Sequence, residues 1–394
     1  MNQPANSPLS GGMQYQLQIY FAGTQNVKPQ LPVSFEELEQ KASEKLPPEA
    51  FGYVAGSAGS EITTSNNKEA FNHWQIVPRM MGDVSQRSIA TELFGMSLPS
   101  PVLLAPIGVL SIVHPESEIA VARAAKSLQV PQIVSTVSSK TLEEIADANG
   151  DNLHWFQLYW GRNKEFTRSL IGRAEKAGYK AIVVTLDTRL FAWRERDIKN
   201  AYLPFLYNEG LANYFSDPVF LAEVGDPAED KLKTMMHFAN CFSNASSTWE
   251  NLAEIRECTK LPIIVKGIQH PDDARKALDQ GMDGIIVSNH GGRQMDGAIG
   301  AIDTLAGIAD AVGDRTTILF DSGIRRGADV FKALALGAKG VLLGRPYVYG
   351  LALAGEKGVK EVTANLLADI DLTMGLAGCN SWQEVTRDHL KRKH

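Results

Sequence analysis

Eight short apolar segments recur along the chain, and most are followed by a stretch with the periodicity of an amphipathic helix. The segments are rich in β-branched residues and do not alternate between apolar and polar positions, which is typical of strands buried on both faces of a parallel sheet. They are 101–105 (PVLLA), 131–135 (PQIVS), 154–158 (HWFQL), 181–185 (AIVVT), 262–266 (PIIVK), 284–288 (GIIVS), 317–321 (TILFD) and 340–344 (GVLLG). Eight strands that alternate with helices predict an α/β fold, a closed (β/α)8 TIM barrel.

A doubly wound sheet is the alternative fold for the same alternation. Closure into a barrel is favoured because the eight units follow one another without a second zone of different composition. In a barrel the carboxyl ends of all strands meet at one mouth, and catalytic residues lie there. Polar residues at the strand ends are therefore the candidates for function.

Two regions do not fit the repeat. Residues 32–100 form an N-terminal extension with helical patterns, and about 191–247 form a segment after the fourth strand that is too long for an ordinary loop. We interpret this long segment as a lid or binding loop, with an oligomer contact as the alternative. The polar start of the chain predicts a flexible tail over 1–31, followed by a single domain over 32–394.

Composition argues against several classes of function. The formal net charge is −6, without the basic face expected of a nucleic-acid binder. No apolar run approaches the ~20 residues of a membrane span, and the polar N-terminus does not resemble a signal peptide. The three cysteines have no metal-type spacing and are expected to be free thiols. We expect a cytoplasmic protein without a metal ion.

A histidine and several charged side chains follow the predicted strands. His290 comes after the sixth strand and Asp187 after the fourth, so the two can meet at the mouth, where a carboxylate would tune the imidazole as a base. Lys266 ends the apolar fifth strand. Because an unpaired buried ammonium is costly, Lys266 is expected to face an anion or an electron-rich ring.

Arginines suggest two anion sites. The loops after strands seven and eight commonly bind phosphate in barrels, and here they carry Gly323, Arg325, Gly344 and Arg345. Arg293, three residues after His290, and Arg194 on the long segment are candidates for a paired grip on a planar carboxylate. These residues predict a substrate that is a small carboxylic acid.

Motifs across the chain resemble those of the FMN-dependent L-2-hydroxy-acid oxidases and dehydrogenases, over about residues 32–390. The motifs are FGYVAGSAG (51–59), APIG (105–108), FQLYW (156–160), TLDT (185–188), IVKGIQHPDDA (264–274), SNHGGRQ (288–294), DSGIRRG (321–327) and GRP (344–346). The combination is specific because it spans nearly the whole chain.

The resemblance implies FMN as the cofactor and a role for each matching residue. Around the flavin ring it implies contacts from Pro106, Ile107, Gly108, Ser135, Gln157, Thr185, Lys266 and Ser288, and at the phosphate from Asp321, Gly323, Arg325, Gly344 and Arg345. It implies that Tyr53, Arg194 and Arg293 bind the substrate carboxylate. Tyr159 would contact the substrate hydroxyl, and His290, paired with Asp187, would take a proton.

The resemblance also implies a reaction, the oxidation of L-lactate by O2. The branch of the family with the most similar motifs converts lactate to acetate, CO2 and water, and the alternative is release of pyruvate and hydrogen peroxide. Family members are commonly tetramers or larger, so a homo-oligomer is expected.

Two other classes of protein are weighed against this reading. A non-catalytic flavin-binding or phosphate-binding barrel would not need the group of His290, Asp187, Arg293 and Tyr159. A membrane-associated dehydrogenase that passes electrons to a quinone would be expected to carry an apolar or basic docking segment on the long loop. Here that loop is acidic around 223–230.

Overall fold

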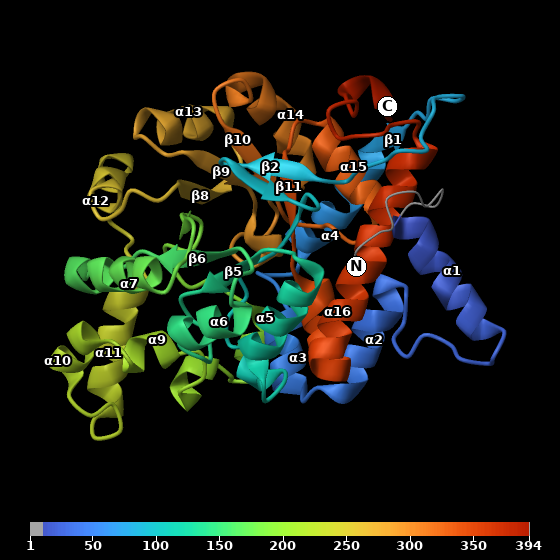
Figure 1. Cartoon of the computed structure of the whole chain (residues 1–394). Helices are drawn as coiled ribbons and strands as arrows, with labels where there is room; N and C mark the ends of the chain where they lie inside the picture. The colour runs from blue at the N-terminus through green and yellow to red at the C-terminus, as the bar shows by residue number, and fades with distance from the viewer. Residues whose placement is uncertain (1–10, 394) are drawn as a thin grey trace.

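The computed structural model describes residues 11–393 and closes eight parallel strands into a barrel (Figure 1). The strands follow chain order around the barrel, and the last pairs with the first through Val341–Val102 and its neighbours. They are β4 (Val102–Leu104), β5 (Gln132–Ser135), β6 (His154–Tyr159), β7 (Ile182–Thr185), β8 (Ile263–Ile268), β9 (Gly284–Val287), β10 (Thr317–Phe320) and β11 (Gly340–Leu343). The predicted barrel is confirmed, and the doubly wound alternative is excluded because its sheet would leave two open edges.

Helices cover the outside of the barrel. They are α5 (Ser117–Leu128), α6 (Leu142–Asn149), α7 (Lys164–Lys176), α12 (Leu252–Arg256), α13 (Pro271–Asp279), α14 (Ala301–Val312), α15 (Gly327–Ala335) and α16 (Arg345–Leu376). Local sequence sets several of their starts: Thr141 and Glu144 form a capping box at α6, and Asn163 caps α7. The long α16 is two helices joined at a break, where Gly355 has a φ of +59°.

A hairpin closes the end of the barrel opposite the mouth. Its strands are β2 (Thr91–Leu93) and β3 (Met96–Leu98), paired antiparallel. Leu93 and Leu98 belong to the buried cluster that fills the barrel interior, and the Phe94 ring lies 5.7 Å from the Trp155 ring. The barrel is therefore a packed core with one open end.

The N-terminal extension lies along α16 and reaches the mouth. It contains α2 (Phe35–Lys45), α3 (Pro48–Ala55), α4 (Ile62–Glu69), η1 (Ala70–His73) and β1 (Trp74–Ile76). Near the C-terminus, η6 (Arg387–His389) leads into β12 (Leu390–Arg392), which pairs antiparallel with β1. The two ends of the domain are thus joined by a small sheet.

The expected tail over 1–31 needs a correction, because residues 11–23 form a helix, α1 (Gly11–Gly23), packed on α16 (Figure 1). The Tyr15 hydroxyl donates to Asn365 Oδ1 at 2.9 Å, and the Gly12 N–H donates to Asp371 Oδ2 at 3.2 Å. The polar residues at the start of the chain hid this segment, which docks on α16 through Gly12 and Tyr15. Residues 1–10 of the expected tail lie outside the described residues.

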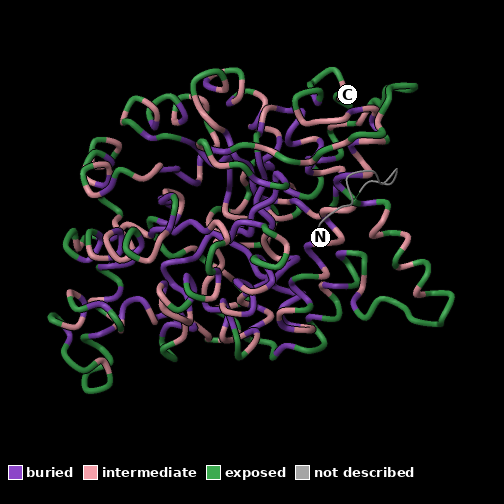
Figure 2. Tube along the Cα trace, viewed as in Figure 1, coloured by how far each residue is buried: buried purple, intermediate pink, exposed green. Residues whose placement is uncertain are grey.

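The long segment after β7 is largely helical. It contains α8 (Glu195–Lys199), η3 (Pro204–Tyr207), α9 (Ala212–Phe215), α10 (Pro218–Val224) and α11 (Lys231–Phe242), with η4 (Trp249–Asn251) leading into α12. In Figure 1 its helices α9, α10 and α11 form a layer beside the barrel. Buried residues concentrate along the barrel strands and the inner faces of the helices (Figure 2). Within residues 11–393, no helix is both long and apolar enough to cross a membrane.

The barrel interior should dominate stability. Leu319 on β10 is 0% exposed, whereas Leu376 at the end of α16 is 75% exposed. We expect Leu319→Ala to lower the free energy of unfolding by about 2–5 kcal/mol, because it removes buried methyl groups and leaves a cavity. Leu376→Ala is the control and should change it by less than about 0.5 kcal/mol. Denaturant titration followed by circular dichroism measures both, and equal losses would contradict the assignment of the core.

Candidate active site

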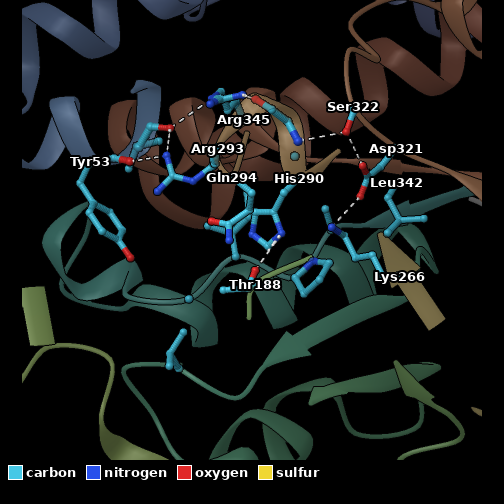
Figure 3. A pocket seen from close by; sticks show the side chains of 18 of the residues that line it. Tyr53, Thr188, Lys266, His290, Arg293, Gln294, Asp321, Ser322, Leu342 and Arg345 are labelled. Carbon is cyan, nitrogen blue, oxygen red and sulfur yellow. Dashed lines mark hydrogen bonds and ion pairs between the residues drawn. The ribbon is translucent and has the colours of Figure 1, made fainter. Parts of the chain in front are cut away.

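A cavity opens at the mouth of the barrel, between the N-terminal extension, the strand-end loops and the long segment (Figure 3). Most of the residues predicted from sequence line it: Tyr53, Pro106, Ile107, Gly108, Tyr159, Arg194, Lys266, His290, Arg293, Asp321, Gly323, Arg325, Gly344 and Arg345. Asp187 and Ser288 lie directly behind this lining, bonded to His290 and Lys266. The barrel thus gathers residues that are far apart in sequence around one space.

His290 and Asp187 form a hydrogen-bonded pair. His290 Nδ1 lies 2.7 Å from Asp187 Oδ1, and the Thr188 hydroxyl donates to the same oxygen at 3.0 Å. Because a carboxylate oxygen only accepts, we assign the ring proton to Nδ1, which leaves Nε2 as the free acceptor. Burial lowers the pKa of His290, and the charge of Asp187 opposes that shift. The His290 imidazole is therefore neutral and can take a proton from a molecule in the cavity.

Lys266 lies among acceptors at the base of the cavity. Its side chain is 4% exposed, and its Nζ lies 3.5 Å from Asp321 Oδ2 and 3.7 Å from Asp187 Oδ2. Nζ also donates to Ser288 Oγ at 2.9 Å. Burial alone would lower the pKa of Lys266, but the two carboxylates raise it above its ordinary value. Lys266 therefore carries a fixed positive charge into the site. The sequence predicted an anion or an electron-rich ring beside it, and two carboxylates lie there; its contact with a flavin ring stays a prediction.

A bulge in β8 brings Lys266 and Asp187 together. The register of β8 against β9 shifts just after Lys266, and Gly267 there has a φ of +108°. A Cβ on Gly267 would lie 2.8 Å from the Cβ of Asp187. Only glycine suits this position, because a side chain would need the left-handed backbone and would push Asp187 away from its partners.

The glycines after His290 allow the neighbouring chain to approach. Gly292 has a φ of +81°, and a Cβ there would lie 2.3 Å from Thr64 Oγ1 on α4. Gly291 has a φ of +63°, and a Cβ there would meet Arg345 Nη1 at 3.0 Å. His290 itself has a φ of +58°, in the short helix η5 (His290–Gly292). The strained turn aims the imidazole into the mouth.

Arg293 and Arg194 come together at the cavity wall, as predicted for a carboxylate grip. Arg293 Nη1 donates to the carbonyl oxygens of Tyr53 and Gly56, at 2.6 and 2.7 Å, and its guanidinium lies 5.1 Å from the centre of the Tyr53 ring. Arg194 Nε donates to the Arg293 carbonyl at 3.1 Å. Burial, together with the neighbouring Arg194, lowers the pKa of Arg293 to about 9. Two close cations at pH 7 make this wall a strong anion site.

Gln294 joins several parts of this wall and was not predicted from sequence. Its Oε1 accepts from Arg194 Nη2 at 3.0 Å, and its Nε2 donates to the carbonyl oxygens of Asp187 and Leu190, at 3.1 and 3.3 Å. One amide side chain therefore connects Arg194 to the backbone of Asp187, the partner of His290. Its place in SNHGGRQ next to Arg293 is the only signal in the sequence.

The arginines assigned to phosphate lie at another part of the same cavity. The Arg325 guanidinium stacks on the Phe35 ring at 4.1 Å, and its Nε is buried without a partner among the described residues. The Arg345 guanidinium instead contacts backbone carbonyls of Val54, Gly56 and Gly291, at 3.0–3.1 Å. Arg345 thus holds neighbouring loops together as well as lining the cavity, a second use that the sequence did not suggest.

A chain of polar side chains crosses the ends of β5, β6 and β7. Ser135 Oγ donates to Gln157 Oε1 at 3.1 Å, and Gln157 Nε2 donates to Thr185 Oγ1 at 2.9 Å. All three are buried, and they bond to one another rather than line the main cavity. Their predicted contacts with the flavin ring stay predictions.

Ser322 is a second residue that the predicted site left out. Its hydroxyl donates to Asp321 Oδ1 at 2.6 Å and accepts from the N–H groups of Asn289 and Gly291, at 3.2 and 3.0 Å. It links the end of β10 to the turn that carries His290 (Figure 3).

The long segment supplies an apolar wall. Phe191, Phe205 and Phe242 line the cavity, and the rings of Phe191 and Phe242 stack with centroids 5.4 Å apart. Tyr159, on the barrel side, lies 4.6 Å from the Phe242 ring. The long segment therefore contributes an aromatic side to the cavity that contains His290.

The residues present fit FMN. A buried cation at Lys266 suits the ring edge that gains negative charge on reduction. The buried Nε of Arg325 has no acceptor within residues 11–393, and a phosphate oxygen would supply one. Gly323, with a φ of +113°, turns the chain where a Cβ would lie 2.6 Å from Asn67 O. Across residues 11–393, no group of three or more His, Cys, Asp or Glu side chains is arranged to hold a metal ion.

Comparison with known proteins agrees with this site. A family model described as FMN-dependent dehydrogenase matches residues 42–392. An L-lactate oxidase of Lysinibacillus sphaericus is 45% identical over 351 residues, 89% of this chain and 90% of the relative. An FMN-dependent alpha-hydroxy acid dehydrogenase of Penicillium citrinum is 44% identical, over 96% of this chain and 95% of the relative. The crystal structure of a lactate oxidase from Pediococcus acidilactici superposes with a TM-score of 0.82 at 39% identity, covering 91% of this chain and 94% of the other.

The turn after β9 offers a test of the site's geometry. Gly292 and Gly297 both have positive φ, of +81° and +69°, but a Cβ meets Thr64 only at Gly292 and finds nothing within 4 Å at Gly297. Gly297→Ala should cost about 1 kcal/mol of folding free energy from backbone strain alone. Gly292→Ala should cost about 1–3 kcal/mol more, because η5 or α4 must move. Thermal unfolding of the two variants measures the difference, and equal losses would show that Thr64 does not confine the turn.

Proposed function

Since the chain belongs to the FMN-dependent dehydrogenase family and is an FMN-dependent 2-hydroxy-acid oxidoreductase, we propose that it oxidises L-lactate with O2 as a lactate 2-monooxygenase. The overall reaction is L-lactate plus O2 to acetate, CO2 and water. An L-lactate oxidase, which releases pyruvate and hydrogen peroxide, is the second candidate. The names of the L-lactate oxidases of Lysinibacillus sphaericus and Nostoc support lactate as the substrate of either candidate.

The observation that carries the proposal is the meeting of the His290–Asp187 pair with the two arginines at one cavity wall. Arg293 and Arg194 would hold the substrate carboxylate, which fixes the neighbouring carbon near His290. His290 Nε2 would then accept a proton from the substrate, and Asp187 would stabilise the imidazolium that forms. A non-catalytic flavin carrier has no use for this arrangement.

Tyr159 and Lys266 complete the proposed roles. Burial, followed by the charge of Asp187, raises the pKa of Tyr159, so its hydroxyl stays protonated and can donate to the substrate oxygen. Bound FMN supplies the two-electron acceptor, which O2 reoxidises. Lys266 would offset negative charge at the ring.

The monooxygenase outcome depends on keeping both first products together. Pyruvate and hydrogen peroxide would have to remain enclosed until they react to acetate, CO2 and water. The wall of Phe191, Phe205 and Phe242 supports this, because a segment placed at the cavity can delay the departure of products if it closes over them. A segment that opens faster than this reaction would give the oxidase outcome.

Product counting separates the two candidates. With L-lactate in air and catalase present from the start, peroxide that leaves the enzyme is destroyed before it can attack pyruvate in solution. We expect about one acetate for each lactate consumed under these conditions, measured by proton NMR. A stoichiometric yield of pyruvate would overturn the monooxygenase and support the oxidase, and no turnover of lactate would remove both.

The pH dependence tests the base. Burial lowers the pKa of His290, so the acid limb of kcat/KM should lie below its ordinary value of about 6.5. Asp187→Asn removes the charge that favours the protonated imidazole, so the limb should move to still lower pH and the maximum should fall about 100-fold.

Asp303→Asn is the matched control for this test. It removes the carboxylate partner of His73 on the surface, 2.9 Å away, and should leave the profile unchanged. An acid limb that moves to higher pH in Asp187→Asn would contradict the assignment of His290.

We also propose, on the resemblance and the acidic composition, that the protein is a cytoplasmic homo-oligomer. Size-exclusion chromatography with light scattering measures the oligomeric state.

A further inference from the structure

A second cavity lies behind the phosphate end of the active site. It is lined on one side by Tyr15, Gln16 and Ile19 of α1, and on the other by Arg325. Arg325 also lines the active-site cavity. One arginine side chain is therefore shared by the cofactor cavity and a space covered by the N-terminal helix.

The surroundings of Arg325 make its attraction for a phosphate depend on how much water reaches the guanidinium. Its guanidinium lies 4.1 Å from the centre of the Phe35 ring, and Phe35 also lines the α1 cavity. Its Nε is buried and has no partner among the described residues. A cation in such a setting attracts a phosphate dianion more strongly than a cation surrounded by water does, because little water screens the two charges.

Helix α1 packs on α16, but Gly12 is its only buried residue. Its N-terminal end docks where Gly12 meets α16: the Gly12 N–H donates to Asp371 Oδ2 at 3.2 Å, and a Cβ on Gly12 would lie 2.7 Å from Ala368 O. Further along, Tyr20 and Phe21 are 61% and 66% exposed. A segment with so little burial can open locally at a lower free-energy cost than the barrel.

We propose that α1 is a clamp that retains the cofactor: docked on α16, it limits the access of water to the outer side of Arg325 and so slows the release of FMN. The helix takes no part in the reaction at His290. The inference rests on FMN as the cofactor and on Arg325 at its phosphate, and it is independent of whether lactate is the substrate.

Two glycines of α1 give a matched pair of variants. Gly12→Ala inserts a methyl group against Ala368 O, whereas Gly23→Ala, at the other end of the helix, meets nothing within 4 Å. After dilution of each holoenzyme, the rise of free flavin fluorescence measures the rate of FMN release. We expect about tenfold faster release from Gly12→Ala, a change of about 1.4 kcal/mol in the barrier. Gly23→Ala should match the unaltered chain.

A truncated holoenzyme that begins at residue 25 removes α1 altogether and should release FMN at least as fast as Gly12→Ala. The same proteins reconstituted with riboflavin, which lacks the phosphate, should all release it at one rate. Equal FMN release from the unaltered, Gly12→Ala and truncated chains would overturn the proposal. So would an equal acceleration for riboflavin, because it would mean a general loosening rather than an effect through Arg325. If either of these two results appeared while lactate turnover was retained, the clamp would be ruled out and the proposed function would stand.

Discussion

The buried charges at the base of the barrel mouth are the constraint on which the site depends. Lys266 Nζ lies 3.7 Å from Asp187 Oδ2 and 3.5 Å from Asp321 Oδ2. His290 adds a fourth group through its contact with Asp187. Removing one partner of such a set leaves an unpaired charge in a poorly hydrated place, which typically costs several kcal/mol. The bulge at Gly267 and the turn at Gly292 are the backbone features that allow these groups to meet.

This arrangement also explains why the anion-binding groups lie where they do. The carboxylates of Asp187 and Asp321 more than offset the single charge of Lys266. The wall of Arg194, Arg293 and Arg345 adds three positive charges to the same cavity, so these groups together are net positive. The negative charges of an acid anion and of a phosphate-bearing cofactor would offset this positive charge. The electrostatics of the mouth thus favour the same two ligands as the family relationship.

Much of the fold and the site could be predicted because both follow from short-range patterns. Apolar runs without alternation marked the barrel strands, and the polar residues after them came together at the mouth because parallel strands end on one side. The start of α13 is also set locally, because Pro271 suits the first turn of a helix and the ring of His270 accepts from the Asp272 N–H.

The parts that escaped prediction depend on contacts between distant segments. Gln294 and Ser322 act through backbone groups of other loops, so residue type and spacing carry little information about them. Arg345 was assigned to phosphate from its loop alone, yet most of its donors meet carbonyls contributed by α3 and by the turn after β9. Helix α1 was missed for a similar reason, because its stability comes from α16, more than 300 residues later in the chain.

The small sheet of β1 and β12 has a consequence for the order of folding. Ile76 pairs with Leu390, and Trp74 with Arg392, so two strands more than 300 residues apart must find each other. Such pairing requires closure of a very long loop unless the intervening chain is already compact. We therefore expect the barrel to form first, and the extension that carries α3 and α4 to be fixed in a later step.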